Sequence, residues 1–376
     1  MTTSLEILDT LIGFDTVSAR SNLPLIAYVE DFLKSRGFAV TRVPDPVEDK
    51  AGLFASIGPT GAGVLLSAHT DVVPVEGQNW TRDPFRLTVE GDRLYGRGTT
   101  DMKGFLATML ACADKASKRT LREPLKLAIS YDEEIGCVGI GRMIDALQPA
   151  IGLPRACIVG EPTSMQVAVG HKGKSAIRAI CHGEAGHSAL APRFTNALHL
   201  AADMVAGLRS MQDDLAKHGA RDGGYAIPYS TVHVGKMSGG TALNIVPDRA
   251  EVLFEFRHLA ADAPDALMAR IQTLADDIAT THGAAITLEQ VTTYPGLDTP
   301  PDTDVTRLVQ RLARTQTLTK VAFGTEAGFF DALGIPTVVC GPGDMEAQGH
   351  KPDEYLLRSQ LDACDVMLDS LLDTLG

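Results

Sequence analysis

The chain has 376 residues, of which 44% are hydrophobic and 22% are charged, and its formal net charge is −13. The length predicts two or three domains, and the composition excludes a disordered chain, a fibre and a small disulfide-bonded scaffold. Because an acidic chain lacks the basic footprint of a nucleic-acid binder and the polybasic segment of a membrane-bound protein, we expect neither kind of partner.

Two further features predict a cytoplasmic protein. The start of the chain lacks the basic region and apolar run of a secretory signal, and no apolar stretch reaches the roughly 18 residues of a membrane-spanning helix. The six cysteines are scattered without a CxxC pair, which is typical of reduced thiols in a cytosolic protein.

The first part of the chain alternates helical and strand-like patterns. The expected elements, in chain order, are helices at 5–14 and 23–36, strands at 38–43, 53–57 and 64–68, a helix at 102–118, a strand at 125–130, a helix at 140–147 and a strand at 157–159. Such alternation predicts an α/β domain whose parallel or mixed sheet is covered by helices on both faces.

The middle of the chain has a different pattern. Apolar residues recur along one face of a long helix at 197–215, and they alternate with charged residues along a strand at 250–257. The other expected elements are strands at 175–181, 230–234 and 285–291, a helix at 264–281 and, closer to the end, a helix at 305–314, a strand at 337–340 and a helix at 355–375. The simplest architecture is an α/β domain, residues 1–173 and 288–376, with an inserted α+β domain at 174–287.

Five short clusters contain residue types that bind divalent metal ions. His69 and Asp71 follow an apolar strand, where open α/β sheets place their sites. The His can bind a metal through one ring nitrogen while the Asp accepts the other ring N–H. A strand-end histidine beside a helix-capping aspartate is an equally good interpretation of these two residues taken alone.

Asp101 comes between a glycine-rich segment and a helix. A lone aspartate there is most often an N-cap, worth about 1 kcal/mol, but its two oxygens could also bridge two metal ions. Glu133 and Glu134 follow the strand at 125–130. Adjacent carboxylates repel each other, so one suits a metal ligand and the other a base; without the other clusters, a solvated acidic turn would be favoured.

Glu161 ends the strand at 157–159, and His350 lies in a loop before the last helix. Taken singly, Glu161 is interpreted as an exposed charge at a strand end and His350 as a surface histidine. Together, the clusters offer imidazoles and carboxylates without a thiolate, which favours catalytic zinc or a related ion over a structural cysteine-rich site. Five ligands with a shared carboxylate predict two ions about 3.5 Å apart.

The segments HTD (69–71), GRGTTDMKG (96–104), DEE (132–134), GEPT (160–163) and GHKPDE (349–354) occur in this order. As a set they resemble the co-catalytic zinc amidohydrolases, a family that includes aminoacylase, carboxypeptidase G, succinyl-diaminopimelate desuccinylase and acetylornithine deacetylase. The resemblance extends over essentially the whole chain. It implies a zinc-peptidase-like catalytic domain with a mixed sheet and an inserted ferredoxin-like domain that serves as lid and dimerisation domain.

Within this family the sequence is most similar to the acetylornithine deacetylases. The segments that carry this similarity are 160–164, 171–173, 186–188, 227–229, 324–327 and 341–343. It implies a small N-acylated amino acid as substrate, with hydrolysis of N-acetyl-L-ornithine to L-ornithine and acetate in arginine biosynthesis. The alternatives are a broad aminoacylase, a succinyl-diaminopimelate desuccinylase or a dipeptidase. An enzyme with a single essential metal also stays open, whereas a non-catalytic binding protein is disfavoured because every ligand and Glu133 are present.

The resemblance also implies roles for the five metal ligands. His69 and Glu161 would hold one Zn²⁺, and Glu134 and His350 would hold the other, with Co²⁺ as a plausible substitute. Asp101 would bridge the two ions.

Further roles follow from the same resemblance. Asp71 would orient His69. Glu133 would be the general base, which takes a proton from the metal-bridging water and delivers it to the leaving amine. His187, from the inserted domain, would stabilise the tetrahedral oxyanion in the site of the partner subunit of a homodimer.

Four residues would contact the substrate. Asn244 is a second residue contributed by the insertion, and Arg257 would hold the substrate α-carboxylate. Taken without the resemblance, His187 is a satisfied loop histidine, Asn244 a turn residue and Arg257 a cross-strand partner of Glu255. Thr325 is assigned to a substrate-side loop, and Glu326 is a candidate partner for the side-chain ammonium of ornithine.

Overall fold

The computed structural model describes residues 2–376, which form two compact units. The first unit comprises the chain up to His171, Leu297–Val321 and Thr325–Gly376, and the second comprises Lys172–Gly296 and Ala322–Gly324. The expected return to the first unit at residue 288 falls inside a strand of the second, β12 (Ala285–Tyr294). Because β12 pairs with β9 (Gly173–His182) over its whole length, the second unit continues to Gly296.

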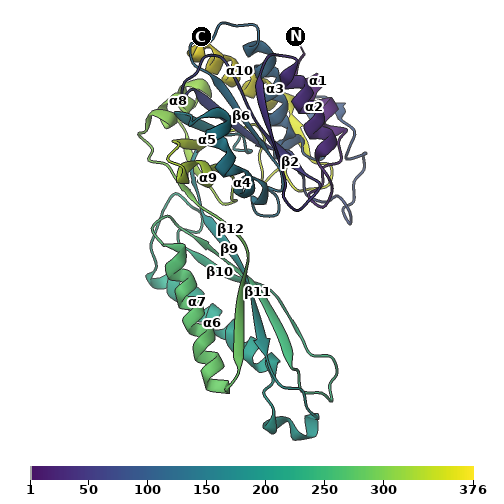
Figure 1. The fold of residues 1–376 in the computed structure, drawn as a ribbon, viewed down its shortest axis with the longest axis vertical. Coiled ribbons are helices and arrows are strands. Elements are labelled where there is room, and N and C mark those ends of the chain that lie inside the picture. Colours follow the sequence, from purple (N-terminus) through teal and green to yellow (C-terminus); the bar gives the residue numbers. More distant parts are fainter. Residues whose placement is uncertain (1) are drawn as a thin grey trace. The chain divides into compact units, whose positions relative to one another are not determined.

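A nine-stranded mixed sheet forms the centre of the first unit (Figure 1). Its strands are β1 (Ala39–Pro44), β2 (Ala51–Ile57), β3 (Val64–His69), β6 (Leu125–Ser130), β7 (Ala156–Val159), β8 (Val167–His171), β13 (Leu297–Asp298), β14 (Leu318–Val321) and β15 (Thr337–Val339). The order is β1-β2-β6-β3-β7-β15-β8-β13, with β14 beside β8. Because β6, β3 and β7 are parallel neighbours, their carboxyl ends meet at one edge.

Helices cover both faces of this sheet, as the sequence predicts. Leu53, Leu66 and Leu127 contribute to a core with one group of helices, α1 (Ser4–Ile12), α2 (Leu23–Lys34), α3 (Gly104–Ala116), α8 (Asp304–Leu312) and α10 (Arg358–Leu375). The alternate residues Phe54 and Leu65 are buried on the opposite face. There the sheet packs against α4 (Val138–Met143), α5 (Leu147–Ile151) and α9 (Ala327–Ala332).

Local sequence signals define the start of α1. Thr3 and Glu6 form a capping box at the start of α1, in which each side chain accepts the backbone N–H of the other residue. The apolar residues Ile7, Leu8 and Leu11 then form one buried face.

A small three-stranded sheet in the first unit was missed by the sequence analysis. It has the order β16-β5-β4 and consists of β4 (Thr88–Glu90), β5 (Arg93–Tyr95) and β16 (Tyr355–Leu357). The last helix therefore begins at Arg358 rather than at 355, because Tyr355 pairs with Tyr95 in the sheet. This pairing brings the segment before α10 beside the segment that leads into α3.

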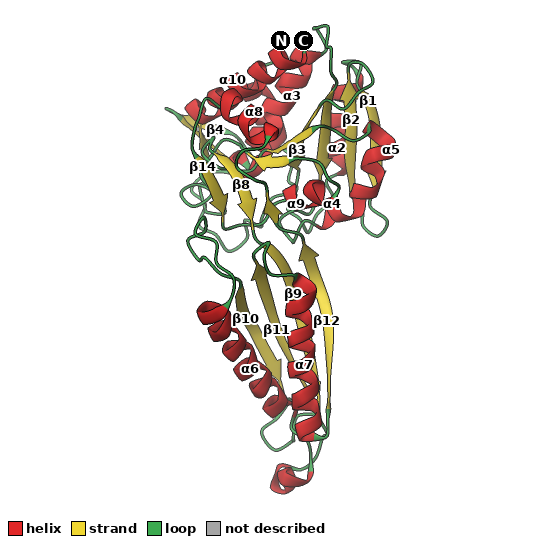
Figure 2. Ribbon diagram, turned by 90° about the vertical axis from the view of Figure 1, so that its left-hand side faces the viewer, coloured by secondary structure: helices red, strands yellow, loops and turns green. Residues whose placement is uncertain are grey.

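The second unit is a four-stranded antiparallel sheet with two helices (Figure 2). The strands run in the order β10 (Thr231–Gly239), β11 (Arg249–His258), β9 and β12, and the helices are α6 (Ala197–His218) and α7 (Pro264–His282). Along β11, Val252, Phe254 and Phe256 are buried in a core with both helices. Because α6 and α7 cover the same sheet, this α+β arrangement is the one predicted for the middle of the chain.

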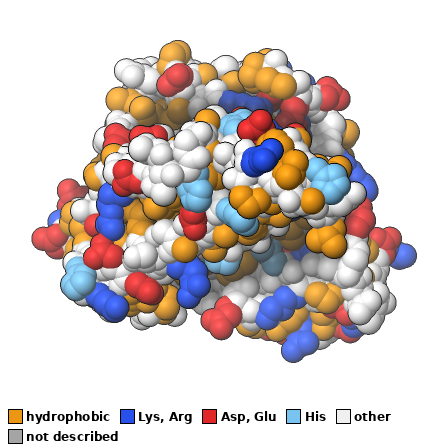
Figure 3. All heavy atoms as spheres, turned by 90° about the horizontal axis from the view of Figure 1, so that it is seen from below, with side chains coloured by type: hydrophobic (Ala, Val, Ile, Leu, Met, Phe, Trp, Pro, Cys, Tyr) orange, Lys and Arg blue, Asp and Glu red, His pale blue; other side chains and the backbone are white. Residues whose placement is uncertain are grey.

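The mixture of charged and apolar side chains on the surface and the state of the cysteines are those of an ordinary globular chain. Acidic, basic and hydrophobic side chains are interspersed on the face drawn in Figure 3. The six cysteines are free and buried. Within residues 2–376, every helix is either too short or too polar to cross a bilayer.

Candidate metal centre

The carboxyl ends of β3, β6 and β7 bring the first candidate residues together. His69, the last residue of β3, is the register partner of Ser130, the last residue of β6. Val159 at the end of β7 pairs with Ser67. Consequently the turn that carries Glu133 and Glu134, and the turn that carries Glu161, leave the sheet at the same edge as His69.

Asp101 lies between two histidines. Its Oδ1 is 3.1 Å from Nε2 of His69, and its Oδ2 is 3.0 Å from Nε2 of His350. A second carboxylate approaches each histidine: Glu161 Oε1 is 3.6 Å from His69 Nε2, and Glu134 Oε2 is 3.0 Å from His350 Nε2. The five residues expected to bind metal therefore form two groups of side chains joined by the carboxylate of Asp101.

The interpretation of Asp101 as a helix cap is wrong. Asp101 lies inside a π-helical turn, Thr99–Lys103, with non-helical angles (φ −123°, ψ 95°) and a cis peptide bond to Met102. Helix α3 begins afterwards, at Gly104, without a side-chain cap. The carboxylate oxygens of Asp101 therefore contact the two histidines instead of the N–H groups of the helix.

The residues present fit divalent metal ions. Glu134 Oε1 and Glu161 Oε1 are buried and have no hydrogen-bond partner within residues 2–376, and a buried anionic oxygen without a partner is costly. The contacts of 3.0–3.6 Å between these side-chain atoms are close to the separation of about 3.3–3.6 Å between two ligands bound 2.0–2.2 Å from one tetrahedral ion. Imidazole and carboxylate donors also suit zinc and related ions.

The electrostatics of the cluster point the same way. Burial, helped by Asp101, raises the pKa of Glu134 to about 7. Burial and neighbouring carboxylates raise the pKa values of Glu133 and Glu161 well above the ordinary value. Hydrogen bonds to Asp101 and Glu134 raise the pKa of His350 to about 10. The site therefore disfavours the ionised form of these carboxyl groups, which bound cations would stabilise.

Asp71 contacts both His69 and the turn that carries the two glutamates. His69 Nδ1 is 3.0 Å from the Asp71 carbonyl oxygen and 3.4 Å from Oδ1. Oδ1 accepts the N–H of Glu133 at 3.0 Å, and Oδ2 accepts the N–H of Glu134 at 3.3 Å and the hydroxyl of Ser18 at 2.7 Å. The sequence analysis missed these bonds, by which Asp71 positions the turn as well as the imidazole.

Glu133 has a second neighbour that the sequence did not reveal. The buried thiol of Cys137 donates to Glu133 Oε1 at 3.3 Å. On the other side of the turn, the ammonium of Lys50 is 2.6 Å from Asp132 Oδ2, and both side chains are buried. Lys50 and Cys137 belong to no recognisable motif in the sequence, so only the fold could identify these contacts.

Thr325 and Glu326 are buried in this structure, with exposed fractions of 0% and 1%. The carboxylate of Glu326 accepts hydrogen bonds from the hydroxyls of Ser67, at 3.1 Å, and Ser130, and burial raises its pKa to about 6. A substrate ammonium would have to displace both hydroxyls. The burial of Glu326 therefore disfavours the ammonium contact that the sequence suggested for it.

The second unit brings His187 and Asn244 into neighbouring segments. His187 forms an antiparallel bridge with Ile245, and the N–H of Ser188 donates to the Asn244 carbonyl at 3.1 Å. His187 Nδ1 accepts the N–H of Ala189 at 3.0 Å, which assigns the proton of the neutral ring to Nε2. Arg257 lies apart from them on β11, where it donates to Glu255 on the same strand at 2.9 Å.

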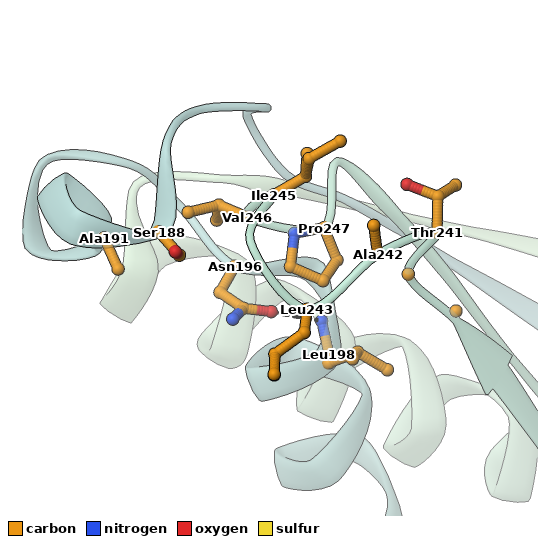
Figure 4. A pocket seen from close by; sticks show the side chains of 12 residues that line it. Ser188, Ala191, Asn196, Leu198, Thr241, Ala242, Leu243, Ile245, Val246 and Pro247 are labelled. Atoms are coloured by element: carbon orange, nitrogen blue, oxygen red, sulfur yellow. Dashed lines mark hydrogen bonds between the residues drawn. The ribbon is translucent and has the colours of Figure 1, made fainter.

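A pocket of about 500 Å³ adjoins the His187 and Asn244 segments. Figure 4 shows its lining side chains, which come from the turn after His187, from the start of α6 and from the loop at 239–247. In that loop Leu243 and Ile245 are exposed, by 101% and 43%. The pocket is therefore mainly apolar and belongs wholly to the second unit.

Comparisons with known proteins agree with this geometry. The model of "Peptidase family M20/M25/M40" matches residues 65–374. Acetylornithine deacetylase of Shigella sonnei (strain Ss046) is 33% identical over 362 residues, which cover 94% of this chain and 92% of that protein. Acetylornithine deacetylase of Klebsiella pneumoniae (strain 342) is 34% identical over 360 residues, with the same coverage of 94% and 92%.

Solved structures share the fold. The M20 family metallo-carboxypeptidase Sso-CP2 of Sulfolobus solfataricus superposes with a TM-score of 0.80 at 20% identity, over 99% of each chain. The Bacillus subtilis YXEP protein, described as a dinuclear metal binding peptidase of the M20 family, gives 0.70 at 17% identity over 99% of this chain and 97% of that one.

Proposed function

The chain belongs to peptidase family M20/M25/M40 and is a metal-dependent hydrolase, and within this family we propose that it hydrolyses the amide bond of N-acetyl-L-ornithine. The products are L-ornithine and acetate, and the reaction belongs to arginine biosynthesis. The two acetylornithine deacetylases that match 94% of the chain support this substrate. The observation that carries the chemistry is Asp101, with one carboxylate oxygen against His69 and the other against His350.

The five clustered side chains would hold two zinc ions, for which Co²⁺ is a substitute. His69 and Glu161 would bind one ion, Glu134 and His350 would bind the other, and Asp101 would bind both. When bound, such ions supply Lewis acidity to the amide carbonyl and to the attacking water.

Glu133 is the general base in this proposal. It accepts a proton from the attacking water and delivers it to the amine nitrogen when the C–N bond breaks. In the ion-free fold, burial raises the pKa of Glu133 above its ordinary value, and a carboxylate with a raised pKa is a better proton acceptor. Asp71 fixes the main chain of Glu133, and the Cys137 thiol fixes its carboxylate oxygen.

The second unit would serve as a lid and as the interface of a homodimer. His187 would donate its Nε2–H to the tetrahedral oxyanion in the site of the partner subunit, and Asn244 would act with it. Arg257 would bind the substrate α-carboxylate, because a guanidinium pairs with a carboxylate through two parallel hydrogen bonds. We also propose a cytoplasmic location, which the six free cysteines support.

A substrate panel tests the proposal. Purified, zinc-loaded protein is assayed on N-acetyl-L-ornithine, N-acetyl-L-methionine, N-succinyl-diaminopimelate and a dipeptide, each with and without a chelator. Chelator-sensitive turnover with the highest kcat/KM on acetylornithine is the expected result. A higher kcat/KM on another member of the panel would replace the substrate and leave the metal centre in place.

The Glu133→Gln variant tests the mechanism, because glutamine keeps the shape of the side chain but cannot accept the proton. We expect kcat to fall by about 10²–10⁴-fold with unchanged zinc content. The matched control is Glu30→Gln, at an ion pair with Lys34 on α2 in which the Glu30 side chain is half-buried; it should leave kcat unchanged. A kcat of Glu133→Gln within threefold of the parent would contradict the assignment of the base.

A further inference from the structure

A buried ion pair that the proposed mechanism does not use lies beside the metal centre. Arg97 and Glu354 are both 1% exposed at their side chains, and Nη1 of Arg97 is 2.6 Å from Oε2 of Glu354. Arg97 follows β5, and Glu354 precedes β16, so the small sheet brings the two residues together.

The second oxygen of Glu354 binds the main chain that carries Asp101. Oε1 accepts the N–H groups of Gly98 at 3.1 Å, Thr100 at 2.9 Å and Asp101 at 3.2 Å. Gly98 has a φ of +86°, a conformation that glycine adopts without strain and that directs neighbouring N–H groups toward one anion. A single carboxylate oxygen therefore accepts three N–H groups of the segment that carries Asp101.

Arg97 connects the same carboxylate to the loop that carries His350. Its Nη2 donates to the side-chain oxygen of Gln78, and Nε2 of Gln78 donates to the His350 carbonyl at 3.1 Å. Nη1 also contacts the carbonyl of Lys351, the next residue, at 3.4 Å. Glu354, Arg97 and Gln78 thus form a continuous chain of contacts from the main chain of Asp101 to the main chain of His350.

We propose that Arg97 and Glu354 are positioning residues that fix the separation of Asp101 and His350 and thereby set the metal affinity of the centre. Asp101 and His350 come from loops that are distant in sequence, and each supplies one ligand atom to the same contact, 3.0 Å apart. Metal sites are sensitive to such outer contacts, whose loss typically weakens metal affinity by about 10–100-fold. The inference rests on the metal centre of the proposed function, but not on its substrate.

The pair could instead contribute only to stability, so the test must separate the two roles. Removing one partner leaves an unpaired buried charge, which destabilises the protein whatever the role of the pair. The double variant Arg97→Met/Glu354→Met removes both charges at similar side-chain volume, and such replacements are often neutral for stability. It leaves the three N–H groups near Asp101 without their acceptor.

The matched control is a pair in the same unit that is far along the chain from every ligand. Arg36 Nε is 2.7 Å from Asp114 Oδ1, with side-chain exposures of 20% and 6%. Asp114 lies on α3, ten residues after Gly104, which corresponds to about 15 Å along the helix. The control variant is Arg36→Met/Asp114→Leu.

The measurement is the dissociation constant of each bound ion, by competition of Co²⁺-loaded protein with a chromophoric chelator, together with the Co²⁺ absorption spectrum and Tm. We expect at least one ion to bind ten or more times more weakly in Arg97→Met/Glu354→Met, with an altered spectrum, and both ions of the control to stay within threefold of the parent. Affinities within threefold of the parent in the double variant would overturn the inference.

Two outcomes need a further comparison. If the double variant does not fold, Glu354→Gln, which keeps the shape and one acceptor oxygen, decides by the same two thresholds. If the parent chain itself binds fewer than two ions, the dinuclear centre is wrong, and this inference is overturned with it. Because the assay contains no substrate, a wrong choice of substrate leaves its result unaffected.

Discussion

The contacts of Asp71 lead to a quantitative prediction for the Asp71→Asn variant. The aspartate accepts the N–H groups of Glu133 and Glu134 on different oxygens, whereas an asparagine has only one acceptor oxygen. Its amide NH₂ would face an N–H group and lose that hydrogen bond. A hydrogen bond to a charged group is worth about 1.5–3 kcal/mol, so if this energy positions the base, kcat should fall by about 10–150-fold.

Steady-state kinetics on acetylornithine and thermal unfolding test this prediction together. We expect a lower kcat with a KM within threefold of the parent, because Asp71 contacts the turn of the base and not the proposed substrate-binding residues. The control is Asp114→Asn, which loses charged contacts to Arg36 and Lys118 and should lower Tm without changing kcat. Equal kcat values for Asp71→Asn and the parent would refute the positioning role of this carboxylate.

Three further predictions follow from the site. Chelation should lower Tm more at pH 8 than at pH 6. In the ion-free fold the pKa of Glu134 is raised from 4.5 to about 7, and the pKa of His350 is raised from 6.5 to about 10. The folded state therefore binds more protons than the unfolded chain, and it loses stability as the pH rises through this range. Calorimetry with and without zinc checks this, and a Tm difference independent of pH would contradict it. Glu326→Gln should reduce kcat/KM for acetylornithine and acetylmethionine by similar factors, because the carboxylate is buried against Ser67 and Ser130. A KM increase confined to acetylornithine would instead support a contact between Glu326 and the substrate ammonium. Mixing His187→Ala subunits with Glu133→Ala subunits should recover part of the activity if His187 acts across a dimer. No recovery would mean that His187 acts within its own chain or has no part in catalysis.

The parts of the fold that depend on periodicity were predictable from the sequence. The central strands β3, β6 and β7 are short apolar runs followed by polar residues, and they end where expected, beside His69, Glu133 and Glu161. The α+β pattern of the second unit was equally clear, because β11 alternates and α6 has one apolar face.

The features that the sequence did not reveal are contacts between side chains and distant main-chain atoms. Glu354 binds the N–H of Asp101 across 253 positions of sequence, and no spacing rule relates such residues. Strands β5 and β16 have only three residues each, too few to show a period. For the same reason the local interpretation of Asp101 as a helix cap is wrong: a lone aspartate before a helix favours a cap, whereas the carboxylate of Asp101 contacts two histidines that are distant in sequence.

The pairing of β9 with β12 has a consequence for the two ends of the inserted segment. Lys174 and Tyr294 are register partners at the ends of the two strands, so the inserted segment starts and finishes at neighbouring points about 5 Å apart. A host fold that carries such an insertion needs to open only one short connection, because the two cut ends stay close together. Domain insertion is tolerated where the ends of the insert lie close together, so the entry and exit of the chain leave the order of the strands around the candidate metal centre unchanged.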